Sequence, residues 1–332
     1  MRIVGKILKW FGIAIAVLIA AGAVYAQIGL ALDARHAPPK AEMIAVGGRR
    51  VHVVCRGQGP RTYVLDAGLG GWSVFWWRIQ PLLAEGGRVC AFDRAGTGWS
   101  DRSGGDHDGA TLADELAATV AAAKIPTPFF YVGHSLGANL ALIYYARHPA
   151  DVAGLVLLEP GNPKDLLEDF HGTRAEAMQA SGGGAPYFLA TAAGYLGVTR
   201  LVALSAPGKS FSGEARAQYK TGLGRPDTLA TSMACLAALP KTAYEIMDVK
   251  SLGDTPVLVF YSSEPRQPEG NETAADVKVW HQGYLAYLAS LAAMSSQGIG
   301  PIEVPGSSHK SMVLGEEQAA VVAKSIAEFA AR

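Results

Sequence analysis

The stretch FFYVGHSLGANLALIYY, residues 129–145, constrains the fold more than any other part of this chain. An apolar, strand-like run leads directly into Gly-His-Ser-Leu-Gly, and a helical pattern follows. Where a strand turns this sharply into a helix, the residue at the apex is strained, and only very small residues fit two positions before and after it. Gly133 and Gly137 meet that need around Ser135. The sequence therefore predicts an exposed, activated serine at a tight strand-to-helix turn.

Near-continuous apolar segments alternate with helical patterns on both sides of this turn. Such segments indicate strands of a parallel sheet that is covered by helices on both faces. The class expected is therefore α/β. The expected strands are 50–56, 62–66, 88–93, 129–133, 152–159, 256–261 and 301–304, and the longer helices are 73–84, 111–124, 273–294 and 316–330.

The alternation stops between residues 161 and 254, where several short helical patterns occur without a clear strand. We expect this segment to be a helical cap inserted into a core formed by residues 37–160 and 255–332. The cap is mostly apolar, which favours a substrate with a hydrophobic group. Its aromatic residues Tyr187, Phe188 and Tyr195 are candidates for contact with that substrate.

Residues 1–36 differ from the rest of the chain. No charged side chain occurs from Trp10 to Leu32, whereas Arg2, Lys6 and Lys9 precede this run. The run is long enough to cross a bilayer as one helix, and the preceding positive charge favours a cytoplasmic N-terminus. We expect a single-pass anchor with the catalytic part on the outer, periplasmic or extracellular face. The alternative is a cleaved secretory signal, because residues 24–26 (Val-Tyr-Ala) offer small residues for a signal peptidase.

Charge and cysteine content exclude several classes of function. The chain has 29 basic and 29 acidic residues, so its formal net charge is zero. No overall positive electrostatic field would therefore attract nucleic acid as a partner. Cys55, Cys90 and Cys235 are too few for a disulfide framework. We expect buried, reduced thiols, although export would permit one pair between Cys55 and Cys90. The sequence contains no Cys-x-x-Cys and no His-Glu-x-x-His, so no metal site is predicted.

Over residues 45–332 the order of these motifs resembles the α/β-hydrolase family. The closest resemblance is to bacterial serine hydrolases that combine DRAGTGWSD, residues 93–101, with the Gly-His-Ser-Leu-Gly turn. The resemblance implies a mostly parallel eight-stranded sheet with an inserted helical cap. It also implies hydrolysis through an acyl-enzyme, with no cofactor and no metal.

The resemblance also places the donors that would stabilise a developing oxyanion. One is the amide of Leu136, at the start of the helix after Ser135. The other lies in the loop after strand 62–66, where many relatives have His-Gly and this chain has Ala67-Gly68. Matching the glycine makes the amide of Leu69 the second donor. Asp93 is expected to support the neighbouring loop through hydrogen bonds.

His309 is the expected general base. The other seven histidines lie before the core, in a polar loop, at the turn itself, at the end of a helix, within a helix or in the expected cap. His309 follows the last strand, where the family carries its base and where ligands gather in open α/β sheets.

Two residues compete for the acid that would orient His309. Many relatives carry an Asp a few residues after the seventh strand, and here Glu264 is the nearest carboxylate to that place. Glu159 ends strand 152–159, where some haloalkane dehalogenases of the same superfamily carry their acid. A carboxylate at the end of an apolar strand is costly unless it is paired, which favours Glu159.

The sequence thus predicts a membrane-anchored serine hydrolase that cleaves carboxylic esters. The same three residues would serve an amidase, a thioesterase, a carbon-carbon hydrolase or an acyltransferase. A non-catalytic binding protein on the same scaffold is the alternative from another class. Epoxide hydrolase and haloalkane dehalogenase activities are disfavoured, because similar enzymes carry Asp where Ser135 stands.

Overall fold

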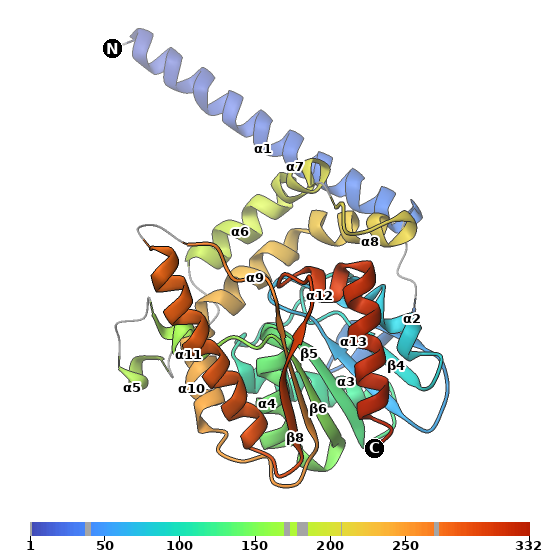
Figure 1. Ribbon diagram of the computed structural model, residues 1–332. Helices are drawn as coiled ribbons and strands as arrows, with labels where there is room; N and C mark the ends of the chain where they lie inside the picture. The colour runs from blue at the N-terminus through green and yellow to red at the C-terminus, as the bar shows by residue number, and fades with distance from the viewer. Residues whose placement is uncertain (1, 37–40, 169–172, 178–184, 207, 269–271) are drawn as a thin grey trace.

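The computed structural model describes residues 2–36, 41–168, 173–177, 185–206, 208–268 and 272–332. An eight-stranded sheet forms its centre, with the strand order β1-β2-β4-β3-β5-β6-β7-β8 (Figure 1). Strands β1 and β2 pair antiparallel, β2 and β4 pair antiparallel, and all other pairs are parallel. The strands are β1 Met43–Val46, β2 Arg49–Arg56, β3 Thr62–Asp66, β4 Arg88–Phe92, β5 Phe129–His134, β6 Val152–Leu158, β7 Val257–Ser262 and β8 Gly298–Val304. The mostly parallel α/β fold is therefore confirmed, with β1 as a strand that was not expected.

Helices cover both faces of this sheet, which explains why its central strands are apolar without alternation. Neighbouring residues of one strand serve opposite faces: Val64 lies in the core under α3, α4 and α11, and Leu65 in the core under α2 and α13. The first face carries α3 Gly109–Ala122, α4 Leu136–Arg147 and α11 Ala274–Ala293, and the second carries α2 Ile79–Leu83, α12 Ser311–Leu314 and α13 Glu316–Phe329.

The prediction of a single helix over residues 73–84 is wrong. A short 3-10 helix, Ser73–Trp76, is followed by α2, which begins at Ile79. Pro81 has no backbone N–H, and its ring would clash with the carbonyl four residues earlier in a continuous helix. The proline is tolerated only because α2 starts afresh just before it.

Residues 161–254 form helices and no strand wherever the structure describes them. Helix α6 packs on α9 and α7 on α8, above the carboxyl ends of the parallel strands, whereas α10 packs back onto α3 and α4 (Figure 1). The glycines at 182–184 lie outside the described residues, and the bounds of the cap stay a prediction. The helices are η3 Asp165–Leu167, α5 Arg174–Ala177, α6 Ala185–Tyr195, α7 Val198–Ser205, α8 Gly213–Gly224, α9 Pro226–Ala237 and α10 Leu239–Asp248.

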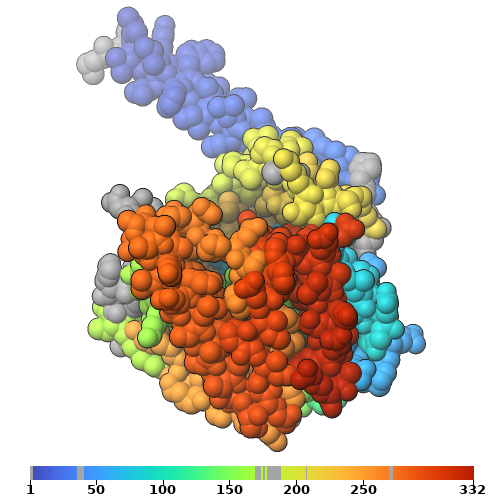
Figure 2. Space-filling model, viewed as in Figure 1, coloured from blue at the N-terminus to red at the C-terminus, as the bar shows by residue number. Residues whose placement is uncertain are grey.

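The N-terminal helix α1, Arg2–His36, is long and apolar enough to cross a membrane over Ile3–Arg35. Its first half projects away from the protein, and its second half lies along the outer helices of the cap (Figures 1 and 2). Helices α6 and α7 together pass the same test of length and composition, but they meet at an angle of 75°. The structure therefore agrees with a membrane anchor or signal segment at the N-terminus.

Cys55 and Cys90 form a disulfide, so the expectation of reduced thiols is wrong at these two positions. The antiparallel register of β2 and β4 places the two residues directly opposite each other. Cys235 is a free, buried thiol as expected. Disulfides of this kind persist in oxidising compartments.

Candidate active site

Ser135 lies at the apex of the turn between β5 and α4, with φ 55° and ψ −120°. A positive φ is rare for a residue with a side chain, and strain of this kind gathers at functional sites. The glycines on either side are required by close approach of backbone. A Cβ on Gly133 would lie 2.3 Å from the carbonyl oxygen of Gly137, and one on Gly137 would lie 2.2 Å from that of Asp66.

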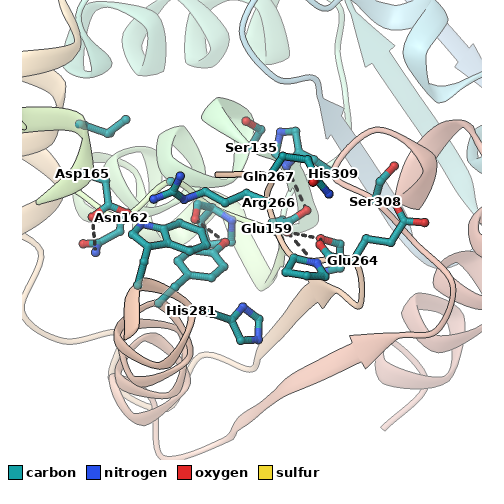
Figure 3. Close-up of a pocket in the computed structure, with 17 residues that line it drawn as sticks. Ser135, Glu159, Asn162, Asp165, Glu264, Arg266, Gln267, His281, Ser308 and His309 are labelled. Carbon is teal, nitrogen blue, oxygen red and sulfur yellow. Dashed lines mark hydrogen bonds and ion pairs between the residues drawn. The ribbon is translucent and has the colours of Figure 1, made fainter. Parts of the chain in front are cut away.

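His309 and Glu159 are joined by a hydrogen bond of 3.0 Å between Nδ1 and Oε2 (Figure 3). Glu159 directly follows β6, and His309 follows β8, so the register of three parallel strands brings them together. The bond fixes the imidazole with its proton on Nδ1 and leaves Nε2 to act as a base.

Ser262, at the end of β7, holds the other oxygen of Glu159. Its hydroxyl donates to Oε1 at 2.5 Å and its backbone N–H donates to the same atom at 3.3 Å. Burial alone would raise the pKa of Glu159, but the bonds from His309 and Ser262 hold that pKa below its usual value. Glu159 is therefore ionised at neutral pH. Ser262 could not be predicted from the sequence, because a serine at the end of a strand carries no distinctive pattern.

Glu264 lies in the loop that follows β7 and also faces the cavity, but its side chain is exposed. Its backbone is held, because its N–H donates to the carbonyl of Ser307 at 2.9 Å. Within the described part of the chain, the Glu264 carboxylate has no hydrogen bond to His309. The geometry thus favours Glu159 over Glu264 as the partner of His309.

Ser135, His309 and Glu159 line one cavity of about 460 Å³ at the carboxyl ends of β5, β6 and β8 (Figure 3). No hydrogen bond joins the Ser135 hydroxyl to His309 in the region that the structure describes. Catalytic hydrogen bonds of this type are often long without substrate and tighten when it binds. The cavity has room for a small ligand, and its far wall consists of Asn162, Asp165, Leu166, Arg266, Trp280, His281 and Tyr284.

Two of the three expected cap aromatics are not part of this wall. Phe188 and Tyr195 are exposed on the outside of the cap and do not line the cavity. The side chain of Tyr187 lies outside the described residues. Trp280 and Tyr284, which stack 5.1 Å apart on α11, occupy the wall instead. Their spacing of four residues places them on one helix face, and this spacing is the signal that the sequence offered.

Leu69 and Leu136 border a second, very small cavity of about 10 Å³ beside Ser135. A space of this size is at the lower limit for holding one water molecule, about 10–15 Å³. The opposite side is formed by Thr231, Ser232 and Cys235 of α9. A Cβ on Gly68 would lie 3.1 Å from Cβ of Ser135, so the loop with Leu69 runs close to the serine. Whether the amides of Leu69 and Leu136 serve as oxyanion donors stays a prediction.

Arg94 holds the loop that precedes Leu69. Its Nη2 donates to the carbonyls of Ala67 and Gly68 and lies 3.4 Å from Oδ1 of Asp66. Burial raises the pKa of Asp66, while the charge of Arg94 and a hydrogen bond from Tyr131 oppose that rise. The buried guanidinium of Arg94 therefore holds the carbonyls of this loop in place.

Asp93 is fully buried and ties three segments together. It accepts hydrogen bonds from the N–H of Ser73 at 2.9 Å, the N–H of Trp99 at 2.8 Å and Nδ1 of His52 at 2.9 Å. Burial opposes ionisation, but the charge and hydrogen bond of His52 lead the contacts that hold the pKa of Asp93 below its usual value. The residue supports the loops around the site and does not reach the cavity.

His134, directly before the serine, packs against His309 with ring centroids 4.6 Å apart. Its Nε2–H donates to the backbone carbonyl of His309 at 2.8 Å. Burial, followed by the proximity of His309, lowers the pKa of His134 to about 3, so its ring stays neutral and keeps the Nε2 proton. His134 therefore positions the loop that carries His309.

No group of three or more His, Cys, Asp or Glu side chains suited to a metal ion occurs among the residues that the structure describes. The residues around Ser135 offer a nucleophile, a base, a carboxylate and two amides. Groups of these kinds are the ones that acyl transfer uses.

A model of the alpha/beta hydrolase fold matches residues 64–234 of the chain. "Putative carbamate hydrolase RutD" of Yersinia enterocolitica is 38% identical over 102 residues, which are 30% of this chain and 35% of that protein. The chain spans only 17% to 42% of the lengths of the first three curated relatives.

Solved structures agree in fold. Cfl2 from Burkholderia cenocepacia superposes with a TM-score of 0.60 at 24% identity, covering 86% of this chain and 93% of its own. A thermophilic esterase from Thermogutta terrifontis superposes with a TM-score of 0.55 at 16% identity, covering 87% of this chain and 96% of its own. At these identities the likeness concerns the fold alone.

Proposed function

Since the chain belongs to the α/β-hydrolase fold family, we propose that it is a serine hydrolase that cleaves carboxylic esters. The observation that carries this proposal is the bond between His309 and Glu159, made at the rim of a cavity that also contains Ser135. A histidine whose Nδ1 proton is held by a carboxylate is ready to accept a proton at Nε2.

In the proposed reaction, Nε2 of His309 takes the proton of Ser135 as Oγ attacks the ester carbonyl carbon. The carbonyl oxygen becomes an oxyanion between the amides of Leu69 and Leu136. When the intermediate collapses, the bond to the alcohol oxygen breaks and His309 returns the proton to that oxygen. Water, deprotonated by His309, then attacks the acyl-enzyme, and the acid leaves as Ser135 regains its proton.

The first half of α1 is exposed and apolar, which supports its role as an uncleaved anchor. Arg2, Lys6 and Lys9 support a cytoplasmic N-terminus and so an outer location for the active site. The disulfide between Cys55 and Cys90 fits that location.

A fluorophosphonate probe tests the nucleophile in the full-length protein. We expect covalent label on the peptide that contains Ser135, found by mass spectrometry, and none in Ser135→Ala. A folded wild-type protein that takes no label would contradict the proposal and favour a binding protein.

A second candidate is hydrolysis of a carbamate or an amide by the same residues. The similarity to the RutD sequence supports it, although that similarity covers 30% of this chain. Parallel assays with an ester, a carbamate and an amide of the same acyl group separate the two. A higher kcat/KM for the carbamate or amide would replace the ester as the proposed substrate.

A further inference from the structure

The outer edge of the cap exposes large apolar side chains on α6 and α7. We call this surface the apolar corner. It consists of Phe188, Leu189, Val198, Leu201, Val202 and Leu204, of which Phe188 is 70% and Leu204 67% exposed. Residues 185–206 contain one charged residue, Arg200. Contiguous apolar surface of this kind on a folded protein marks an interaction site.

The apolar corner adjoins the helix that is suited to cross a membrane. Both α6 and α7 pack on the second half of α1, as the blue and yellow-green atoms of Figure 2 show. Small residues of α1 permit this contact: a Cβ on Gly22 would lie 2.6 Å from the carbonyl oxygen of Leu196, and Ala26 is 1% exposed. Small residues four apart are typical of helices that pack closely in membranes.

Arg200 does not interrupt the apolar surface, because it forms an ion pair with Asp33 of α1. Both side chains of the pair are largely buried. The only charge within residues 185–206 is thus neutralised by α1 itself. A charge at a membrane boundary is tolerated when it is paired in this way.

The contacts between the cap and α1 also determine where along α1 the apolar corner lies. It meets α1 between Gly22 and Asp33, at the end of the uncharged run that lies nearest the core. The run from Trp10 to Leu32 is about 35 Å long as a helix, against about 30 Å of hydrocarbon in a bilayer. If α1 crosses the bilayer, its last turns and the corner lie together at the outer boundary.

We propose that the apolar corner inserts into the outer leaflet of the bilayer that α1 crosses. Helix α7 then lies in the interface with Leu201, Val202 and Leu204 toward the acyl chains, as amphipathic interfacial helices do. Helix α6 packs on α9, and α9 closes the small cavity beside Ser135. The membrane is therefore separated from the active site by the helices of the cap. The proposal does not depend on the catalytic roles given above.

Site-specific fluorescence in vesicles tests this insertion with the full-length chain. Leu201→Cys and Leu204→Cys are each labelled with the NBD fluorophore and reconstituted in phosphatidylcholine–phosphatidylglycerol vesicles. The wild-type protein is the control for background labelling, since Cys235 is buried and the other two cysteines form a disulfide. Val321→Cys on α13, also exposed, is the matched position outside the corner.

We expect lipids with a doxyl group on the acyl chain to lower the emission at 201 and 204 about twofold or more, since an interfacial helix lies about 5–10 Å into the boundary. Emission at 321 should respond only to iodide in the water. If iodide quenches 201 and 204 as it quenches 321, the proposal is wrong. Protection from both quenchers would also overturn it, because the corner would then be covered by a second copy of the chain. Failure to associate with vesicles contradicts it as well.

Discussion

In both the serine turn and the apolar corner, the chain changes direction at glycine. The apolar residues around the turn are buried, whereas those at the corner are exposed to solvent. At the turn, Gly133 and Gly137 pack against backbone, and α4 is buried along nearly its whole length. At the corner, Gly197 has φ 82° and packs against Tyr25 of α1, but the large side chains around it are exposed. Two segments that are similarly apolar in sequence therefore have different environments. One packs in the protein core, and the other, by our proposal, contacts lipid.

The largest effect should follow from changing the acid beside His309. Glu159→Gln keeps a hydrogen bond acceptor but loses the charge that orients and stabilises the imidazolium, so we expect kcat to fall about 10⁴-fold. Glu264→Gln is the matched control and should stay within about twofold of wild type. Ester hydrolysis by the purified proteins measures both. A large loss in Glu264→Gln with a small one in Glu159→Gln would exchange the two roles.

Tight packing at the serine turn can be broken by one methyl group. In Gly137→Ala the new Cβ meets the backbone oxygen of Asp66, so we expect the free energy of unfolding to fall by about 3 kcal/mol. Gly283→Ala on α11 is the control, because a Cβ there meets nothing within 4 Å. At that exposed helix position the same change should stabilise by up to about 1 kcal/mol. Denaturant unfolding in detergent compares them, and equal effects would contradict tight packing at the turn.

The apolar corner can be weakened without touching the cavity. In Leu201→Asn/Leu204→Asn we expect turnover of a long-chain ester embedded in vesicles to fall about tenfold, because the cap is no longer held against the bilayer that contains the substrate. Turnover of a short, soluble ester should not change. Val321→Asn controls for polarity elsewhere on the surface. A parallel loss on both substrates would point to a misfolded cap and not to lost membrane contact.

The smallest effect concerns Glu245, which joins α10 of the cap to the start of α3. Burial, followed by the nearby charge of Asp108, raises the pKa of Glu245 to about 7, while its Oε2 accepts the N–H of Ala110 at 3.0 Å. A raised pKa in the folded state means that stability is full below about pH 4 and declines as the pH rises through about 7.

Glu245→Gln should remove this decline. Relative to the variant, the wild type should lose about 1 kcal/mol between pH 5 and pH 8, allowing for solvent screening of a partly exposed group. Thermal unfolding at several pH values measures the difference. Parallel pH profiles of the two proteins would show that Glu245 is ionised throughout.

Much of the fold followed from local patterns. The positions of β3 to β7 and of α11 and α13 agree with the expected ranges to within about two residues, since apolar runs and glycine breaks are properties of adjacent residues. The prediction of one helix over 73–84 was wrong, because Pro81 requires a new helix to begin just before it. Strand β1 is only four residues long and lies at the sheet edge, where no apolar run is needed.

The sequence by itself determined the strained turn at Ser135, because strand, glycines and helix are contiguous, and the length of α1, because it depends only on uncharged residues in succession. Tertiary structure decided which carboxylate lies beside His309, since Glu159 and Glu264 follow two neighbouring strands and only the packing of the sheet and its loops distinguishes them. It also decided the pairing of Cys55 with Cys90 and the second bond from Ser262 to Glu159. Each of these joins residues far apart in the chain, and such distances are set by packing.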